Sequence, residues 1–102
     1  MPLAPVFKAL ADPTRRAILR ALRDGPLSAG ALAERFPLAR STLSQHLGVL
    51  LEAGLVEVER DGRRRIYRLS TSVLEDVLAF LIELRGGRND EEEPLSGSGT
   101  RA

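Results

Sequence analysis

The sequence predicts a small, mainly α-helical domain that carries one β-hairpin, in the order α-α-α-α-β-β-α. Apolar residues recur at helical spacing in five segments of the first 85 residues. The dipeptide Asp61-Gly62 separates two short runs rich in Val, Ile, Leu and Tyr, which is a strong hairpin signal. A chain of 102 residues has room for a single hydrophobic core.

The first two predicted helices meet at Asp12-Pro13. Residues 3–11 form a short apolar helix. Asp12 is suited to the N-cap and Pro13 to the first position of a second helix, which we expect to end near Arg23. The Gly25-Pro26 pair that follows cannot continue it.

The third and fourth predicted helices are separated by a brief turn at Pro37-Leu38. Ser28 is the expected N-cap of the third helix, over residues 29–35. The fourth helix is expected over residues 39–53, closed by Gly54. Its buried side consists of Leu43, Leu47 and Leu50.

A hairpin and a last helix complete the predicted domain, which we place at residues 1–85. The helix is expected over residues 72–85, capped by Thr71 or Ser72. Residues 86–102 are rich in Gly, Ser and acidic residues and are predicted to be a disordered tail.

Two short helices joined by a tight turn and followed by a two-stranded ribbon describe a winged helix-turn-helix. In this arrangement one helix enters the DNA major groove while the hairpin reaches the neighbouring backbone or minor groove. The outer side of the fourth helix is typical of such a recognition helix, because it carries short hydrogen-bonding groups instead of the usual acids and lysines. The candidate DNA-contacting residues there are Arg40, Ser41, Thr42, Ser44, Gln45 and His46.

These side chains have different expected roles. Gln45 can form two hydrogen bonds with an adenine edge, and the hydroxyl groups can serve bases or phosphates. A polar, solvated helix that binds nothing is the alternative interpretation. His46, the only histidine, lies at the edge of the face and makes either a structural hydrogen bond, which we favour, or a phosphate contact.

The predicted hairpin concentrates positive charge on a chain whose net charge is only +1. Five arginines fall within residues 60–68, together with a single acid, Asp61. We expect at least two of them to contact phosphates, although a solvated basic loop is the alternative. Strand alternation places Arg63 and Arg65 on one side and Arg64 on the other. The candidate wing residues are Arg60, Arg63, Arg64 and Arg65.

The last helix is too apolar for a surface helix. One apolar stripe can pack on the domain, and a second stripe together with the first helix favours a twofold homodimer. Such a dimer would place two recognition helices about one DNA turn apart and predicts double-stranded DNA with a near-palindromic operator as partner. The expected interface residues are Leu3, Val6, Phe7, Leu10, Leu74, Leu78, Leu81 and Ile82.

Other function classes find little support in the sequence. Without cysteine, with one histidine and no evident carboxylate pair, an enzyme, a metal site or a cofactor is not expected. The apolar stretches are too short for a bilayer and no signal pattern opens the chain, so we expect a cytoplasmic protein without membrane contact. A protein-assembly module that binds through the last helix is the alternative function, but the arginine density favours DNA.

Three segments together resemble the ArsR family of bacterial winged-helix repressors: "FKALADPTRRAILRAL" (7–22), "LSAGALAERFPLARSTLSQHLGVLLEAGLV" (27–56) and "RDGRRRIYRLS" (60–70). The resemblance implies homodimers held by the first and last helices, repression at operators that overlap promoters, and DNA contacts from the recognition residues and the wing. The chain departs from metal-sensing relatives because it has no cysteine and its last helix no histidine, and so resembles the metal-independent branch. Ala39 also replaces a frequent Ser cap.

Overall fold

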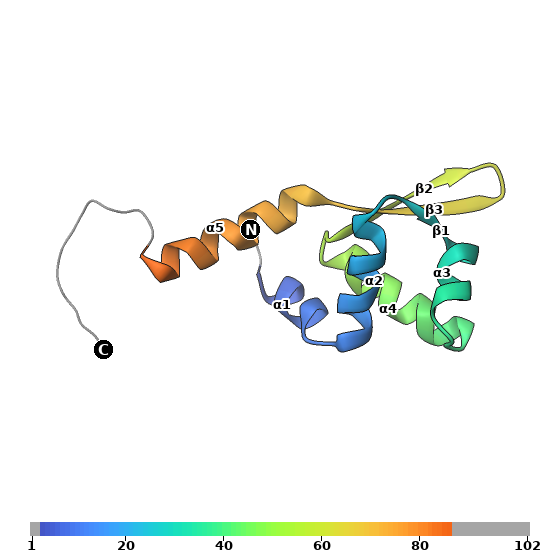
Figure 1. Ribbon diagram of the computed structural model, residues 1–102, viewed down its shortest axis with the longest axis horizontal. Helices are drawn as coiled ribbons and strands as arrows, with labels where there is room; N and C mark the ends of the chain where they lie inside the picture. Colours follow the sequence, from blue (N-terminus) through green and yellow to red (C-terminus); the bar gives the residue numbers. More distant parts are fainter. Residues whose placement is uncertain (1–2, 87–102) are drawn as a thin grey trace.

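The computed structural model describes residues 3–86, which form the predicted winged helix-turn-helix (Figure 1). Its elements are α1 (Ala4–Leu10), α2 (Pro13–Arg23), β1 (Leu27–Ser28), α3 (Ala29–Arg35), α4 (Arg40–Glu52), β2 (Val56–Asp61), β3 (Arg64–Leu69) and α5 (Thr71–Arg85). Of the tail predicted at 86–102, all but Gly86 lies outside the described residues. Within residues 3–86, no helix is long and apolar enough to span a lipid bilayer.

The N-terminal ends of α2 and α3 are determined by capping side chains. The carboxylate of Asp12 accepts a hydrogen bond from the backbone N–H of Arg15 at 3.1 Å, and Ser28 caps α3 in the same way. Both caps confirm the sequence prediction. No side chain caps α4 at Ala39. The predicted cap of the last helix at Thr71 or Ser72 is wrong: the N-cap is Ser70, because its N–H still bonds to the carbonyl of Leu55 and the helix follows the sheet directly.

The sheet contains three antiparallel strands in the order β1-β3-β2, one more than predicted. Strand β1 pairs Leu27 with Tyr67 and Ser28 with Ile66. A strand of two residues is too short to show an alternating pattern, which is why the sequence did not reveal it. In the β2–β3 hairpin, Asp61 pairs with Arg64. The loop is therefore Gly62-Arg63, one residue later than predicted.

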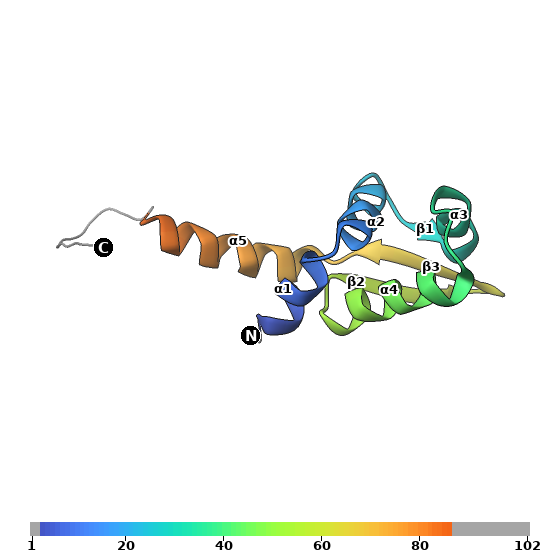
Figure 2. The same cartoon turned by 90° about the horizontal axis from the view of Figure 1, so that it is seen from below.

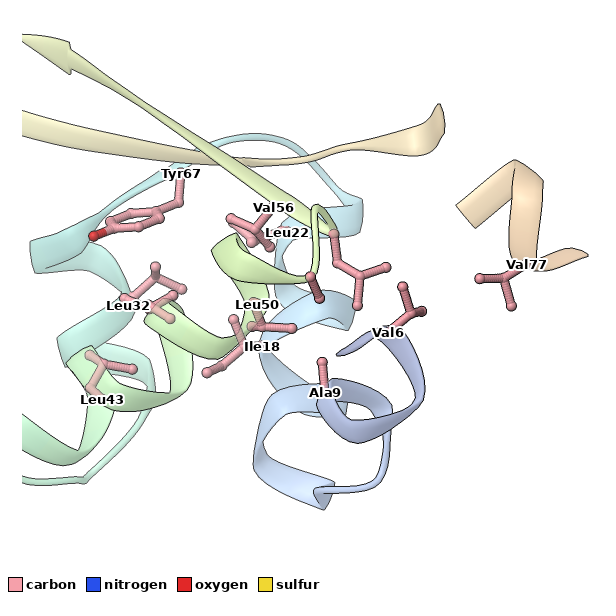
Figure 3. Close-up of a cluster of buried hydrophobic side chains, with 13 residues drawn as sticks. Val6, Ala9, Ile18, Leu22, Leu32, Leu43, Leu50, Val56, Tyr67 and Val77 are labelled. Carbon is pink, nitrogen blue, oxygen red and sulfur yellow. The ribbon is translucent and has the colours of Figure 1, made fainter. Parts of the chain in front are cut away.

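The core lies between the helices and the inner face of the sheet (Figure 3). Leu32 of α3, Leu50 of α4 and Ile18 of α2 are completely buried. Tyr67 of β3 is only 5% exposed, so its side chain is part of the core. Phe36, at the end of α3, is half-buried. This packing fixes α4 and the hairpin relative to each other.

Helix α5 contributes to the hydrophobic core only through its first half. Val77 is buried, and Val73 lies partly buried against the core. Beyond this point the helix extends away from the other elements in both views (Figures 1 and 2). Leu84 is 68% exposed because it lies past the end of the domain.

Candidate nucleic-acid interface

One side of α4 faces away from the core and is open. Leu43, Leu47 and Leu50 point inward from this helix, as predicted. Thr42 and His46 are half-buried at the edges, whereas the remaining predicted contact residues are exposed; these are Arg40, Ser41, Ser44 and Gln45. A Cβ atom added at Gly48 would meet nothing within 4 Å. The face is therefore unobstructed, as a helix that enters a DNA groove requires.

A cleft of about 510 Å³ lies beside this face, between α3, α4 and the hairpin. We call it the arginine cleft. Its arginines are Arg40 of α4 and all four predicted wing residues, Arg60, Arg63, Arg64 and Arg65. The structure thus brings together two sets of residues that the sequence predicted separately.

The strand register keeps like charges close together in the arginine cleft. Arg60 on β2 lies directly opposite Arg65 on β3, so the two share one face of the hairpin. Arg64 lies opposite Asp61 and points to the other face, as strand alternation predicted. Arg63 is in the turn, not in the strand.

The positive charge of the arginine cleft is not balanced by salt bridges in the part of the chain that the structure describes. Within residues 3–86, none of its five arginines forms an ion pair. Arg68 differs, because its guanidinium lies 2.6 Å from the carboxylate of Glu59 across the hairpin. Unpaired guanidinium groups around an open cleft suit the phosphates of a nucleic acid.

Sequence reasoning missed the part of the cleft lining that Ser28 and Gly30 form at the start of α3. The pairing of β1 with β3 brings the start of α3 to this position. The sequence could not predict this pairing, because the two residues of β1 pair with residues of β3 that lie about forty positions later in the chain.

His46 has a structural hydrogen bond, the role that the sequence favoured. Its side chain is 17% exposed, and its Nδ1 lies 3.2 Å from Nη1 of Arg15 and 3.8 Å from the Asp12 carboxylate. The pKa of the Asp12 carboxyl lies below its ordinary value of 3.8, mainly because the Arg15 backbone N–H donates to it. Partial desolvation of the carboxyl acts in the opposite direction.

The predicted dimer residues divide into exposed and buried groups. The prediction that Val6 lies in the dimer interface is wrong, because α1 directs its side chain into the core, where none of its surface is exposed. Leu3, Leu10 and Leu74 are partly buried against the core. The exposed group of predicted residues consists of Phe7, Leu78, Leu81 and Ile82. Together with Leu84, which is exposed but was not predicted to lie in the interface, this group is called here the α1–α5 apolar surface. The rings of Phe7 and Phe80 lie 6.3 Å apart and join the two helices.

Residues 10–59 match the helix-turn-helix domain family. The transcriptional repressor SdpR of Bacillus subtilis is 40% identical over 86 residues, which cover 83% of this chain and 96% of SdpR. Among solved structures, an ArsR-like transcriptional regulator from Rhodococcus sp. RHA1 is 38% identical with a TM-score of 0.78, over 83% of this chain and 78% of the other. A second ArsR family transcriptional regulator is 35% identical with a TM-score of 0.76, over 81% of this chain and 86% of the other.

Proposed function

The chain belongs to the ArsR family of winged helix-turn-helix transcriptional regulators, and we propose that it acts as a homodimer that represses transcription from its own or a neighbouring promoter. It is a DNA-binding regulator, and its relatives are regulators rather than enzymes. The similarity to SdpR, a transcriptional repressor, supports repression. A regulator of promoters acts where the chromosome lies, which supports the predicted cytoplasmic location.

The arginine cleft beside the open face of α4 is the observation that carries this proposal. In the proposed complex α4 enters the major groove, where Gln45 bonds to an adenine edge and the neighbouring hydroxyl groups contact bases or phosphates. The wing arginines neutralise phosphates on the adjacent backbone and set the register of the protein on the duplex. Sequence preference therefore comes from α4, and most of the salt-sensitive affinity comes from the wing.

The α1–α5 apolar surface supports the homodimer. Leu78 is 57% exposed and Leu81 49% exposed, on a helix that extends beyond its own domain. Large apolar side chains that are exposed near one another are unfavourable in water and mark an interface. A twofold axis through this surface would repeat the recognition helix, so we expect a near-palindromic operator with half-sites about one helical turn apart.

Binding to the DNA upstream of its own gene, compared with a scrambled duplex across a salt series, tests the DNA proposal. We expect tight, salt-sensitive binding with a preference for the upstream DNA, unchanged by a metal chelator. Equal, weak binding to both duplexes would contradict autoregulation and favour a distant operator or the protein-assembly alternative.

Sedimentation tests the homodimer. Leu78→Glu should produce monomers, because it places a charge in the proposed interface, and should weaken operator binding as a result. Ser72→Glu adds the same charge on the exposed start of α5, outside the apolar surface, and serves as the matched control. A wild-type protein that sediments as a monomer at micromolar concentration would contradict the proposal.

A further inference from the structure

The side chain of Arg15 lies where α1, α2 and α4 meet. Its Nε donates to the carbonyl of Ala9 at 2.9 Å, and its Nη2 donates to the carbonyl of Lys8 at 3.0 Å. Its Nη1 lies 3.2 Å from Nδ1 of His46, which belongs to α4. A single guanidinium thus joins the end of α1 to the proposed recognition helix.

The carbonyl of Ala9 needs this donor. In a continuing helix it would accept from the N–H four residues later, but that position is Pro13, which has no N–H. The cation also lies at the C-terminal end of α1, where the helix dipole favours positive charge. The planar guanidinium has further donors fixed in direction, and one of them points to α4.

Arg15 also determines the state of His46. A guanidinium can only donate, so Nδ1 accepts in this hydrogen bond, which requires the tautomer that carries its proton on Nε2. The Asp12 carboxylate, at 3.8 Å, is too far for a hydrogen bond to Nδ1. In the part of the chain that the structure describes, Nε2 has no hydrogen-bond partner. Arg15 therefore fixes both the orientation and the tautomer of the ring.

We propose that Arg15 is a positioning residue for operator binding, which through His46 holds α4 at a fixed orientation to α1 and hence to the α1–α5 apolar surface. This inference rests on the proposed function. His46 directly follows Gln45, so a displaced ring displaces the side chains that would contact bases. In a twofold dimer the displacement occurs in both subunits and changes the spacing of the two recognition helices.

Two pairs of variants test the role. Arg15→Ala removes the link, and Arg16→Ala is its matched control, since Arg16 donates to the carbonyl of Leu10 at 2.8 Å without a bond to α4. His46→Ala removes the acceptor, whereas His46→Asn keeps an acceptor oxygen near the position of Nδ1. The probes are a random duplex and the tightest duplex that the wild-type chain selects from a random library, each measured across a salt series.

We expect Arg15→Ala and His46→Ala to bind the selected duplex about 10-fold more weakly than Arg16→Ala does, which corresponds to a hydrogen bond with a charged donor. Binding to the random duplex and the salt dependence should match Arg16→Ala, because Arg15 contacts no phosphate. His46→Asn should retain most of the wild-type affinity. Nitrogen NMR should show the Nε2–H tautomer of His46 in the wild type and a mixture of tautomers in Arg15→Ala.

The outcomes separate the two proposals. A wild-type chain that selects no sequence overturns the proposed function itself. If it does select one, equal affinities of Arg15→Ala and Arg16→Ala, or of His46→Ala and His46→Asn, overturn the positioning role alone. Should Arg15→Ala fail to fold, Arg15→Lys replaces it, because lysine keeps the charge at the end of α1 but not the planar arrangement of donors.

Discussion

Neutralising Arg65 should weaken DNA binding and, at the same time, stabilise the fold. Arg65 lies in the arginine cleft, directly opposite Arg60 across the hairpin. Arg65→Gln removes one positive charge and keeps a long polar side chain. In the free protein the charge is repelled by its neighbour, whereas in the proposed complex it is attracted by a phosphate. The same substitution therefore weakens DNA binding and stabilises the folded state.

The two magnitudes follow from this geometry. Each neutralised phosphate contributes about 0.9 to the slope of log affinity against log salt concentration, so the variant should lose about one unit of slope. Over a salt range from about 50 to about 200 mM, the affinity ratio of wild type to variant should then shrink roughly 3-fold. Removing a like charge directly across an antiparallel pair should raise the free energy of unfolding by roughly 0.2–1 kcal/mol at low salt. Salt should diminish this gain.

Fluorescence anisotropy with a random duplex measures the slope, and urea denaturation measures the free energy of unfolding. Arg20→Gln is the matched control, because Arg20 is exposed on α2 and does not line the cleft. A slope identical to that of the wild type would refute the assignment of Arg65 to a phosphate. A lower free energy of unfolding would refute the repulsion between Arg60 and Arg65.

Three further predictions concern α4, the core and the start of α2. Gln45→Ala should cost roughly 1–3 kcal/mol on the selected operator but leave random DNA unaffected in a binding assay; equal losses on both would place Gln45 outside the recognition face. Leu50→Ala should lower the free energy of unfolding by about 2–5 kcal/mol in urea, at fixed protein concentration, because Leu50 is completely buried. The lowered pKa of Asp12 stabilises the fold above its unfolded value of 3.8, and this contribution disappears as the pH falls through the lower folded value. The stability advantage of the wild type over Asp12→Asn should therefore shrink in that acid range in thermal denaturation, and a constant difference would contradict the shift.

The elements that the sequence predicted well depend on neighbours within a few residues. Asp12 and Ser28 cap their helices because a short side chain reaches an N–H three positions later. The spacing of Leu43, Leu47 and Leu50 reveals the buried side of α4 since it repeats within one turn. The face opposite to it, with Ser41, Ser44 and Gln45, follows from the same period. These features need no knowledge of the rest of the chain.

Errors of prediction arose where one short segment had to be placed against another. Periodicity showed that Val6 and Phe7 belong to one apolar region, but only the packing of α1 decided that Val6 enters the core while Phe7 stays 40% exposed. Likewise, Leu84 follows the buried Val77 at helical spacing, and yet it is 68% exposed because it lies beyond the domain.

The sequence by itself determined the five helices, the hairpin, the face of α4 and the arginines of the wing, because local periodicity, capping groups and turn residues specify them. Tertiary structure alone decided that β1 pairs with β3, that Arg40 and the wing arginines line one cleft, and that Arg15 bonds to His46 across 31 positions of sequence. The physical reason is the range of the interactions. Caps and helical periods act over three or four residues, whereas a cleft or a bond between helices exists only after the core has set distant segments side by side.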